Sequence, residues 1–368
     1  MLVKDIKLKN FRNYQDLNLE FSSKINVFVG NNAQGKTNIL EALYLSSLTN
    51  SHRTSNYKEM IEWGKSESAV SINVKKEIGN IKLDIQLGKN GKKARINNLT
   101  SNKLSEYIGK LNVVLFAPED LELVKGSPSI RRKFMDLEFV QMSSEYLFNL
   151  LNFKTVLKNR NTYLKKPIES QDQDYLEVLN FQLIEYGSQL IKKRFELIEK
   201  LSLIAQEIHQ SIANDEKLEI KYKTFKKINS KTEIDEIKEI FLIELNKNRK
   251  REDMFQTTLV GPHHDDIVFF INDKEVATFA SQGQQRTTAL STRLAEIKLI
   301  KEQTGEYPIL LLDDVFSELD SNRQTHLIKY IEDKVQTFIT TPSLSDINQE
   351  IIKEPKIFYV DNGEVENG

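Results

Sequence analysis

A glycine-rich segment near the N-terminus carries the clearest chemistry in the sequence. It reads Gly30-Asn31-Asn32-Ala33-Gln34-Gly35-Lys36-Thr37 and matches the P-loop (Walker A) pattern G-x-x-x-x-G-K-[ST]. In such a loop the backbone N–H groups surround phosphates, and the following helix adds partial positive charge at its N-terminus. The lysine reaches the β- and γ-phosphates and the hydroxyl binds Mg²⁺. The segment predicts a site for ATP and Mg²⁺ in which Lys36 is catalytic and Thr37 is a metal ligand.

A second pattern lies far along the chain, where the four apolar residues 309–312 precede Asp313 and Asp314. A buried parallel strand of this kind delivers carboxylates to the edge of a sheet, where ligands of open α/β sheets bind. We expect Asp313 to hold Mg²⁺, directly or through water, and Asp314 to orient or deprotonate an attacking water as a catalytic residue. A strand that merely ends in a polar turn would look the same, so this prediction depends on the P-loop.

A third pattern opens a helix between these two, at Ser281-Gln282-Gly283-Gln284. Ser281 has the character of a helix N-cap, and capping could be its whole role. A serine and a glycine at a helix start, upstream of an acidic strand end, also resemble the signature motif of ABC-type ATPases. Residues 317–320 resemble the D-loop of that superfamily. The resemblance implies that Ser281, Gly283 and Gln284 contact a nucleotide held by a second copy of the chain.

The elements that must position these residues can be read from apolar periodicity. Residues 25–29 form a continuous apolar run before the P-loop, and helical spacing follows it. Alternation from Ala69 to Ile96 predicts an antiparallel sheet, and further strands are expected at 111–116, 267–271, 309–312, 337–341 and 357–360. Helical spacing dominates from about Ser127 to Asn248, with a break between Ile212 and Glu219. We predict an α/β fold in which residues 1–117 and 255–368 form one head, with a mainly helical domain, 118–254, inserted between them.

Composition limits the classes of function. The 368 residues include 52 basic and 53 acidic side chains, so an anionic partner must be held by a local patch. With no cysteine, disulfides, thiolate zinc sites and cysteine nucleophiles are excluded, which fits a reducing compartment. No apolar signal segment or membrane-length apolar run is present, so we expect a cytoplasmic protein with no membrane association. Basic clusters occur at 89–95, 131–133, 192–194, 221–227 and 247–251. With 29% charged residues such runs are expected as solvated helix faces, so no single cluster predicts a DNA contact.

A set of short motifs resembles one family within the ABC superfamily. The P-loop and the signature are too far apart for a transporter subunit, and the chain is too short for the long heptad arms of chromosome-maintenance proteins. The motifs besides the P-loop are Phe11-Arg12-Asn13-Tyr14, Ser51-His52-Arg53, Phe116-Ala117-Pro118-Glu119-Asp120, Arg131-Arg132, Gly261-Pro262-His263 and Ser-Gln-Gly-Gln-Gln-Arg from Ser281. Together they resemble the RecF family of bacterial recombination and gap-repair proteins.

The resemblance implies an ABC-type ATPase head whose hydrolysis is slow, Mg²⁺-dependent and stimulated by DNA. It implies an ATP-dependent homodimer that clamps single-stranded or double-stranded DNA at gaps and helps RecR- and RecO-like mediator proteins to load recombinase. The corresponding biology is DNA repair, DNA replication, DNA damage and the SOS response. Arg12 and Asn13 would lie near the nucleotide. The chain departs from the family at His264, where an arginine is usual.

Two other functions remain open from the residues alone. A P-loop kinase would use the same phosphate-binding loop to phosphorylate a small acceptor, but it gives no reason for the serine-led helix at Ser281. A non-hydrolysing scaffold would bind ATP only to hold its dimer together, and it would not need Asp314.

Overall fold

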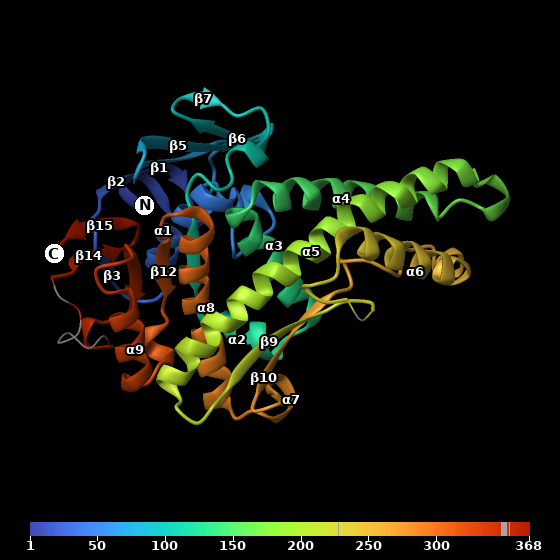
Figure 1. Ribbon diagram of the computed structural model, residues 1–368. Helices are drawn as coiled ribbons and strands as arrows, with labels where there is room; N and C mark the ends of the chain where they lie inside the picture. Colours follow the sequence, from blue (N-terminus) through green and yellow to red (C-terminus); the bar gives the residue numbers. More distant parts are fainter. Residues whose placement is uncertain (227, 347–351, 353) are drawn as a thin grey trace. The chain divides into compact units, whose positions relative to one another are not determined.

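The computed structural model describes residues 1–226, 228–346, 352 and 354–368 (Figure 1). The chain forms two compact units, one made of residues 1–120 with 290–368 and the other of residues 121–289. The predicted domain boundary at 254/255 falls inside the second unit, because the strand that begins at Asp266 pairs and packs with elements of that unit.

A mostly parallel sheet forms the centre of the first unit. Its strands, in spatial order, are β15 (Glu364–Asn367), β14 (Lys356–Asp361), β3 (Ile25–Val29), β13 (Thr337–Thr341), β12 (Ile309–Asp313) and β8 (Val113–Phe116). All neighbours are parallel except β14 and β15. Strands β3, β13 and β8 are buried along their whole length, as expected of parallel strands that are covered on both faces.

An antiparallel sheet is the second layer of this unit. Its strands, in spatial order, are β2 (Tyr14–Glu20), β1 (Leu2–Phe11), β4 (Ser68–Lys76), β5 (Gly79–Gly88), β6 (Gly91–Ile96) and β7 (Leu99–Thr100). Buried and less buried side chains alternate along β4, so one face of this sheet packs on the core. The antiparallel sheet predicted between Ala69 and Ile96 is therefore present.

Helix α1 (Lys36–Leu48) contacts strands of both sheets, namely β4 and β5 of one and β8, β12 and β13 of the other. Ile39, Leu40 and Leu43 have no exposed surface, and a helix covered on both sides is apolar around most of its circumference. The remaining helices of the unit are η1 (Tyr57–Met60), η2 (Leu104–Glu106), η3 (Pro118–Asp120), η5 (Phe316–Glu318), α9 (Ser321–Ile331), η6 (Leu344–Asp346) and the later turns of α8 (Gln282–Thr304). The packing of α1 fixes the position of its first turn, which ends the P-loop.

The second unit is mainly helical. Its helices are α2 (Leu121–Lys125), α3 (Pro128–Met142), α4 (Ser144–Tyr163), η4 (Ile168–Ser170), α5 (Gln173–Ile212), α6 (Ile234–Phe255), α7 (Val276–Phe279) and the start of α8. Helix α5 packs against α4 and α6 (Figure 1). It also packs against a three-stranded sheet with the order β11 (Lys274–Glu275), β10 (Asp266–Ile271) and β9 (Leu218–Lys223).

Strand β9 corrects the sequence interpretation, which treated this region as helical with a break. It pairs antiparallel with β10, with Ile220 opposite Phe269. Leu218, Ile220 and Tyr222 are buried and the residues between them are charged, so apolar and charged residues alternate along this strand. The pattern was obscured because lysine and glutamate are poor strand formers and the partner strand lies more than 40 residues away.

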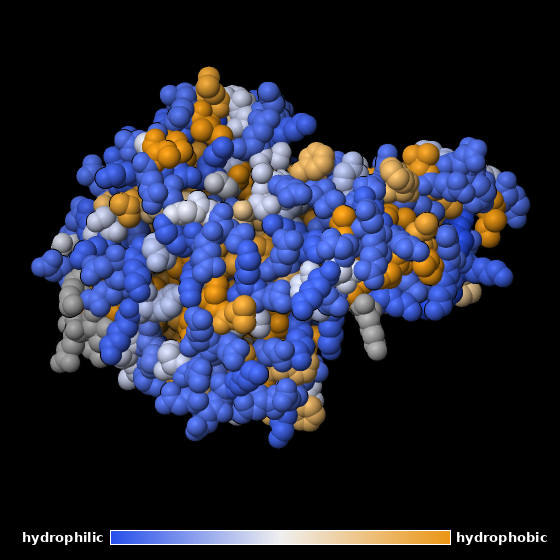
Figure 2. Space-filling model, in the orientation of Figure 1, coloured by the Kyte–Doolittle hydropathy of each residue, from blue (hydrophilic) through white to orange (hydrophobic). Residues whose placement is uncertain are grey.

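Hydrophilic side chains cover most of the face seen in Figure 2, and apolar groups interrupt them over the region of α4 and α5. Phe148 and Leu151 on α4, and Val178 and Phe181 on α5, are exposed. The helical unit therefore leaves part of its apolar surface outside its own core. In the part of the chain that the structure describes, no helix is long and apolar enough to cross a membrane.

Candidate nucleotide-binding site

The P-loop follows β3 directly. At two of its glycines, neighbouring atoms leave no room for a side chain. A Cβ on Gly30 would lie 2.2 Å from the carbonyl oxygen of Val360 on β14. Gly35 has a φ of +120°, and a Cβ there would lie 2.6 Å from the side-chain nitrogen of Asn13. The loop therefore has the tight backbone path that lets its N–H groups approach phosphates.

Lys36 begins α1 and folds its side chain back over the loop. Its ammonium donates hydrogen bonds to the carbonyl oxygens of Gly30, at 2.5 Å, and Asn31, at 2.8 Å. Burial lowers the pKa of Lys36, while the negative charges of Asp314 and Asp313 oppose that shift. The positive charge thus lies beside the loop that would receive the phosphates, as the sequence predicts.

The acidic end of β12 lies beside the P-loop because β12, β13 and β3 are parallel neighbours, so their carboxyl ends lie along the same side of the sheet. Asp313 pairs in register with Thr340 of β13, and Thr341 of β13 pairs with Val29 of β3. The carboxyl ends of these parallel strands therefore bring residues from three distant parts of the sequence together. The hydroxyl of Thr37 donates a hydrogen bond of 2.9 Å to Oδ1 of Asp313.

Thr340, at the end of β13, contacts the acidic strand end in a way that the sequence did not predict. Its hydroxyl donates to Oδ1 of Asp313 at 2.7 Å and accepts a hydrogen bond from the backbone N–H of Asp314 at 2.9 Å. Asp314 has a φ of +53°, a left-handed conformation that is uncommon outside glycine. One threonine therefore fixes both the first carboxylate and the backbone that presents the second.

The hydroxyl of Thr37 and the carboxylate of Asp313 fit a Mg²⁺ site. Both are oxygen donors, which Mg²⁺ prefers, and Mg²⁺ commonly binds through one or two protein carboxylates together with phosphates and water. The two oxygens lie 2.9 Å apart, which is close enough for one small cation to contact both. The described residues contain no group of three or more His, Cys, Asp or Glu side chains suited to a metal.

Asn13 lies at the P-loop, whereas Arg12 makes its hydrogen bonds elsewhere. The amide nitrogen of Asn13 donates to the carbonyl oxygen of Gln34 at 3.0 Å. Arg12 donates to both carboxylate oxygens of Glu41, at 2.7 and 2.6 Å, and to the carbonyl oxygen of Glu59 at 2.8 Å. These bonds tie the first hairpin to α1, and contact between Arg12 and a nucleotide stays a prediction.

Glu41 is a fully buried acid at the centre of a polar cluster that the sequence did not reveal. Burial favours a raised pKa for Glu41, but hydrogen bonds from Arg12 and Ser51 and the charges of Arg12 and Arg53 lower it below its ordinary value. Arg53 also donates to the side-chain oxygen of Asn38 at 2.8 Å. The motif residues Ser51 and Arg53 therefore hold the first turns of α1 in place.

The serine-led helix start lies in the second unit. The backbone N–H of Gln284 donates to the hydroxyl of Ser281 at 3.2 Å, and the N–H of Ser281 donates to the side-chain oxygen of Gln284 at 2.9 Å. These reciprocal bonds form a capping box, so the predicted N-cap is present and Ser281 remains exposed. Gln284 also donates to Glu216 at 2.9 Å, and Glu216 contacts His209 at 2.9 Å.

Other motif residues form an internal polar network in the second unit. Arg131 of α3 makes two hydrogen bonds to the carboxylate of Asp266, at 2.7 and 2.8 Å. Asp265 accepts a hydrogen bond from Tyr222 and lies 3.8 Å from Arg194, and burial raises its pKa to about 6. These residues join α3, α5, β9 and β10, which gives them a structural role.

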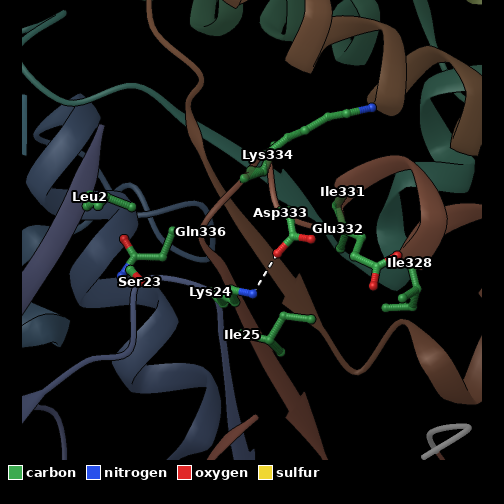
Figure 3. Close-up of a pocket in the computed structure, with 11 residues that line it drawn as sticks. Leu2, Ser23, Lys24, Ile25, Ile328, Ile331, Glu332, Asp333, Lys334 and Gln336 are labelled. Carbon is green, nitrogen blue, oxygen red and sulfur yellow. Dashed lines mark ion pairs between the residues drawn. The ribbon is translucent and has the colours of Figure 1, made fainter. Parts of the chain in front are cut away.

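A pocket at the other end of the central sheet is distinct from the P-loop. It lies by the first residues of β3 and β13 and the end of α9, whereas the P-loop follows the last residue of β3. Figure 3 shows Lys24 reaching Asp333 in this pocket, and the ion pair is 2.7 Å long. Ile25, Ile328 and Ile331 supply apolar lining. Phosphate-binding elements are absent from its lining, so we place the nucleotide at the P-loop.

The fold and the site define an ABC-type ATPase head: a P-loop and an acidic strand end share one edge of a parallel sheet that is flanked by an antiparallel sheet. The family described as "RecF/RecN/SMC N terminal domain" matches residues 2–365. The chain is 54% identical over 373 residues to the DNA replication and repair protein RecF of Oenococcus oeni, covering 100% of both chains. It is 50% identical over 370 residues to the protein of the same name from Ligilactobacillus salivarius, covering 99% of this chain and 97% of that one. The chain belongs to the RecF family.

Solved structures agree with this assignment. A structure of the recombination mediator protein RecF with ATP in the RecFOR pathway has a TM-score of 0.93 and 36% identity, and covers 100% of this chain and 97% of that one. An Smc head bound to a winged-helix domain of ScpA has a TM-score of 0.58 at 14% identity, which shows the shared fold. The predicted fold class and family are confirmed, and the predicted cofactors, ATP with Mg²⁺, are those of the family.

Proposed function

We propose that this chain binds and slowly hydrolyses ATP with Mg²⁺, that ATP binding joins two copies, and that the dimer clamps DNA at gaps during recombinational repair. The observation that carries the ATPase part is the hydrogen bond between Thr37 and Asp313 beside the buried ammonium of Lys36. Relatives named as DNA replication and repair proteins, and structures of a recombination mediator with ATP, support the wider role.

The residues of the first unit divide the chemistry among them. Lys36 would leave its loop carbonyls to neutralise the β- and γ-phosphates. Thr37 and Asp313 would hold Mg²⁺, which when bound supplies positive charge to the phosphate oxygens. Asp314 would orient or deprotonate the attacking water, and the left-handed backbone at this residue sets the direction of its side chain.

The second copy would complete the site. We assign Ser281, Gly283 and Gln284 to the γ-phosphate bound by the partner copy, and the exposure of Ser281 supports this role. Contacts made only in the ATP-bound dimer shift the monomer–dimer equilibrium by mass action. Hydrolysis would remove those contacts, so the nucleotide state would set how long the clamp stays on DNA.

The DNA and mediator partners rest on the family relationship. RecR- and RecO-like mediators and gapped DNA are proposed because relatives are named for DNA repair and for the RecFOR pathway. Several lysines of the basic clusters already have partners within the chain, Lys92 and Lys192 among them. Lys92 donates to the carbonyl oxygen of Thr49 at 2.6 Å, and Lys192 donates to the carbonyl oxygens of Ser230 and Thr232 at 2.9 Å. We therefore assign no single basic cluster to DNA.

The test uses Asp314→Asn, which keeps the shape of the side chain but removes its charge. We expect hydrolysis to fall by about 100-fold or more, while ATP binding remains and the variant accumulates as a dimer in sedimentation. With ATP, this dimer should retain gapped duplex longer than intact duplex. An Asp314→Asn chain that is saturated with ATP and still monomeric would overturn the proposal.

Asp314→Asn also distinguishes an ATPase from a scaffold that binds ATP without hydrolysing it. A non-hydrolysing scaffold would show no ATPase activity in the native chain and would lose nothing on substitution of Asp314. The family assignment favours the DNA-repair ATPase over a small-molecule kinase.

A further inference from the structure

The turn of the C-terminal hairpin lies directly against the P-loop. Asn362 and Gly363 connect β14 to β15. The backbone N–H of Asn362 donates to the side-chain oxygen of Gln34 at 2.6 Å, and the N–H of Gly363 donates to the carbonyl oxygen of Gln34 at 3.2 Å. The end of the chain therefore holds the middle of the P-loop through two main-chain donors.

The carbonyl oxygen of Gln34 has a second donor from the first hairpin. The side-chain nitrogen of Asn13 donates to it at 3.0 Å, and the side-chain oxygen of Asn13 accepts a hydrogen bond of 2.8 Å from Asn38 on α1. The Gln34 carbonyl is thus fixed by the C-terminal turn and by a residue that is itself tied to α1.

Fixing this carbonyl fixes the next phosphate donor of the loop. The C=O of Gln34 and the N–H of Gly35 belong to one planar peptide unit, and in a trans peptide they point in opposite directions. With the carbonyl held by the hairpins, the N–H of Gly35 must point the other way. In a P-loop, N–H groups of this segment bind phosphate, and donors held in place before the ligand arrives cost less entropy on binding.

We propose that the turn at Asn362 and Gly363 is a positioning element of the P-loop, which sets the affinity of the site for nucleoside di- and triphosphates. Gln34 is the positioning residue through which it acts. The proposal rests on phosphate binding at the P-loop, which is the first part of the proposed function. It does not depend on dimerisation or on DNA.

Two glycines provide a matched pair of substitutions. Gly363 has a φ of +85°, and a Cβ there would lie 2.6 Å from the carbonyl oxygen of Asn13. Gly305 has a φ of +84°, but no atom lies within 4 Å of its Cβ position. Alanine at either position brings the same backbone strain. Only alanine at Gly363 also forces the turn away from Asn13 and Gln34.

The experiment titrates native chain, Gly363→Ala and Gly305→Ala with the fluorescent nucleotide mant-ADP at a temperature where all three are folded. Because the substitution disturbs two hydrogen bonds to the loop, we expect Gly363→Ala to bind about tenfold more weakly. Gly305→Ala should match the native chain. Competition by pyrophosphate should weaken by the same factor, because the effect falls on phosphate donors. Irreversibly unfolded chain would instead lower the amount bound at saturation without changing the Kd, and reversible unfolding is excluded by the choice of temperature.

A second variant covers the case in which Gly363→Ala does not fold. Gln34→Ala removes the side-chain acceptor of Asn362 without touching a glycine, and it should weaken mant-ADP and pyrophosphate in parallel. Equal Kd values for Gly363→Ala and Gly305→Ala, or for Gln34→Ala and the native chain, would overturn the inference. A native chain that binds mant-ADP but never dimerises with ATP would overturn the proposed function alone. A native chain that binds neither ligand would overturn both.

Discussion

Asp313 accepts hydrogen bonds from two hydroxyl groups, those of Thr37 and Thr340. Two neutral donors hold the carboxylate in one orientation without cancelling its charge, so it remains able to attract a cation. An arginine or lysine in the place of Thr340 would compete with Mg²⁺ for the same oxygen. The proposed metal ligands therefore lie among small polar side chains, and the buried cation Lys36 lies over the loop.

Replacing that cation tests the phosphate site directly. Lys36→Met keeps the length of the side chain and removes the ammonium, so charge-assisted hydrogen bonds to phosphate are lost. We expect ATP to bind about 100-fold more weakly, and ATP-dependent dimerisation to disappear with it, as measured by mant-ATP titration and sedimentation. Lys329→Met, on the exposed side of α9, is the control and should change neither. Dimerisation of Lys36→Met without nucleotide binding would contradict the prediction.

His263 gives a prediction about stability and pH. Burial, together with the positive charges of His264, Arg132 and Arg160, lowers its pKa to about 3. The unfolded chain takes up this proton near pH 6.5 and the folded chain does not, so stability is lost as the pH falls below 6.5. From pH 7.5 to pH 5 the loss from this one group is about 2 kcal/mol.

His263→Phe removes that proton and should therefore reduce the loss of unfolding free energy between pH 7.5 and pH 5 by about 2 kcal/mol. Urea unfolding at the two pH values measures it. Equal losses in the native chain and in His263→Phe would show that burial of this histidine does not control the effect.

The sequence predicts those members of the candidate site that belong to a local sequence pattern. Lys36, Thr37 and Asp313 belong to motifs with fixed spacing or to an apolar run with acids at its end, and the structure brings them together. Thr340 and Glu41 belong to no such pattern. Their partners lie at least 10 residues away and meet them only through packing and strand register, which a single sequence does not display.

At the scale of elements, hydrogen bonds from its own residues and from another segment stabilise the first turn of α8. The capping box joins Ser281 to Gln284, and Glu216 then fixes the side-chain amide of Gln284 from the segment between α5 and β9. His209, at the end of α5, contacts the other oxygen of Glu216. Three segments of the second unit therefore converge on the start of one helix.

Glu216→Ala tests whether this support matters for assembly. It removes the acceptor of the Gln284 amide, so we expect the ATP-dependent dimer to dissociate about fivefold to tenfold more readily, with nucleotide binding to the single chain unchanged. Glu219→Ala is the control, because Glu219 forms an exposed pair with Lys221 on β9. Sedimentation at several protein concentrations measures the effect. A normal dimer in Glu216→Ala would show that the first turn of α8 needs no such anchor.

The sequence predicts the bounds of a helix or strand best where its apolar residues form a long and regular pattern. Strands β3 and β13 have the bounds that the sequence predicts, and β12 extends one residue further, to Asp313. Strand β9 was missed because alternating charges hid its period. The docking of the β14–β15 turn on the P-loop could not be predicted, because neither segment carries a local signal for the other and more than 300 residues separate them.

At the scale of the whole molecule, the two groups of residues proposed to act on the nucleotide belong to different units. The residues proposed to hold phosphate and metal, and those that support them from Asn13 to Gly363, lie in the unit formed by both ends of the chain. Ser281 and Gln284 lie in the other unit. The role proposed for Ser281 requires a nucleotide that is bound by a second molecule, so the formation of the ATP-dependent dimer tests it.

Ser281→Arg places a long cation at that exposed helix start. The P-loop is untouched, so we expect the single chain to bind ATP normally, while the bulk of the arginine excludes the partner and the variant stays monomeric in sedimentation with ATP. Ser127→Arg is a matched control, because Ser127 is an exposed serine at the N-cap of α3 in the same unit, and it should dimerise as the native chain does. Ser281→Ala removes only the capping hydroxyl, at a cost of about 1 kcal/mol to the helix, and should weaken the dimer without abolishing it. If Ser281→Arg dimerised normally, the serine would be a helix cap and nothing more, and the ATP-dependent contact between copies would have to lie elsewhere on the surface.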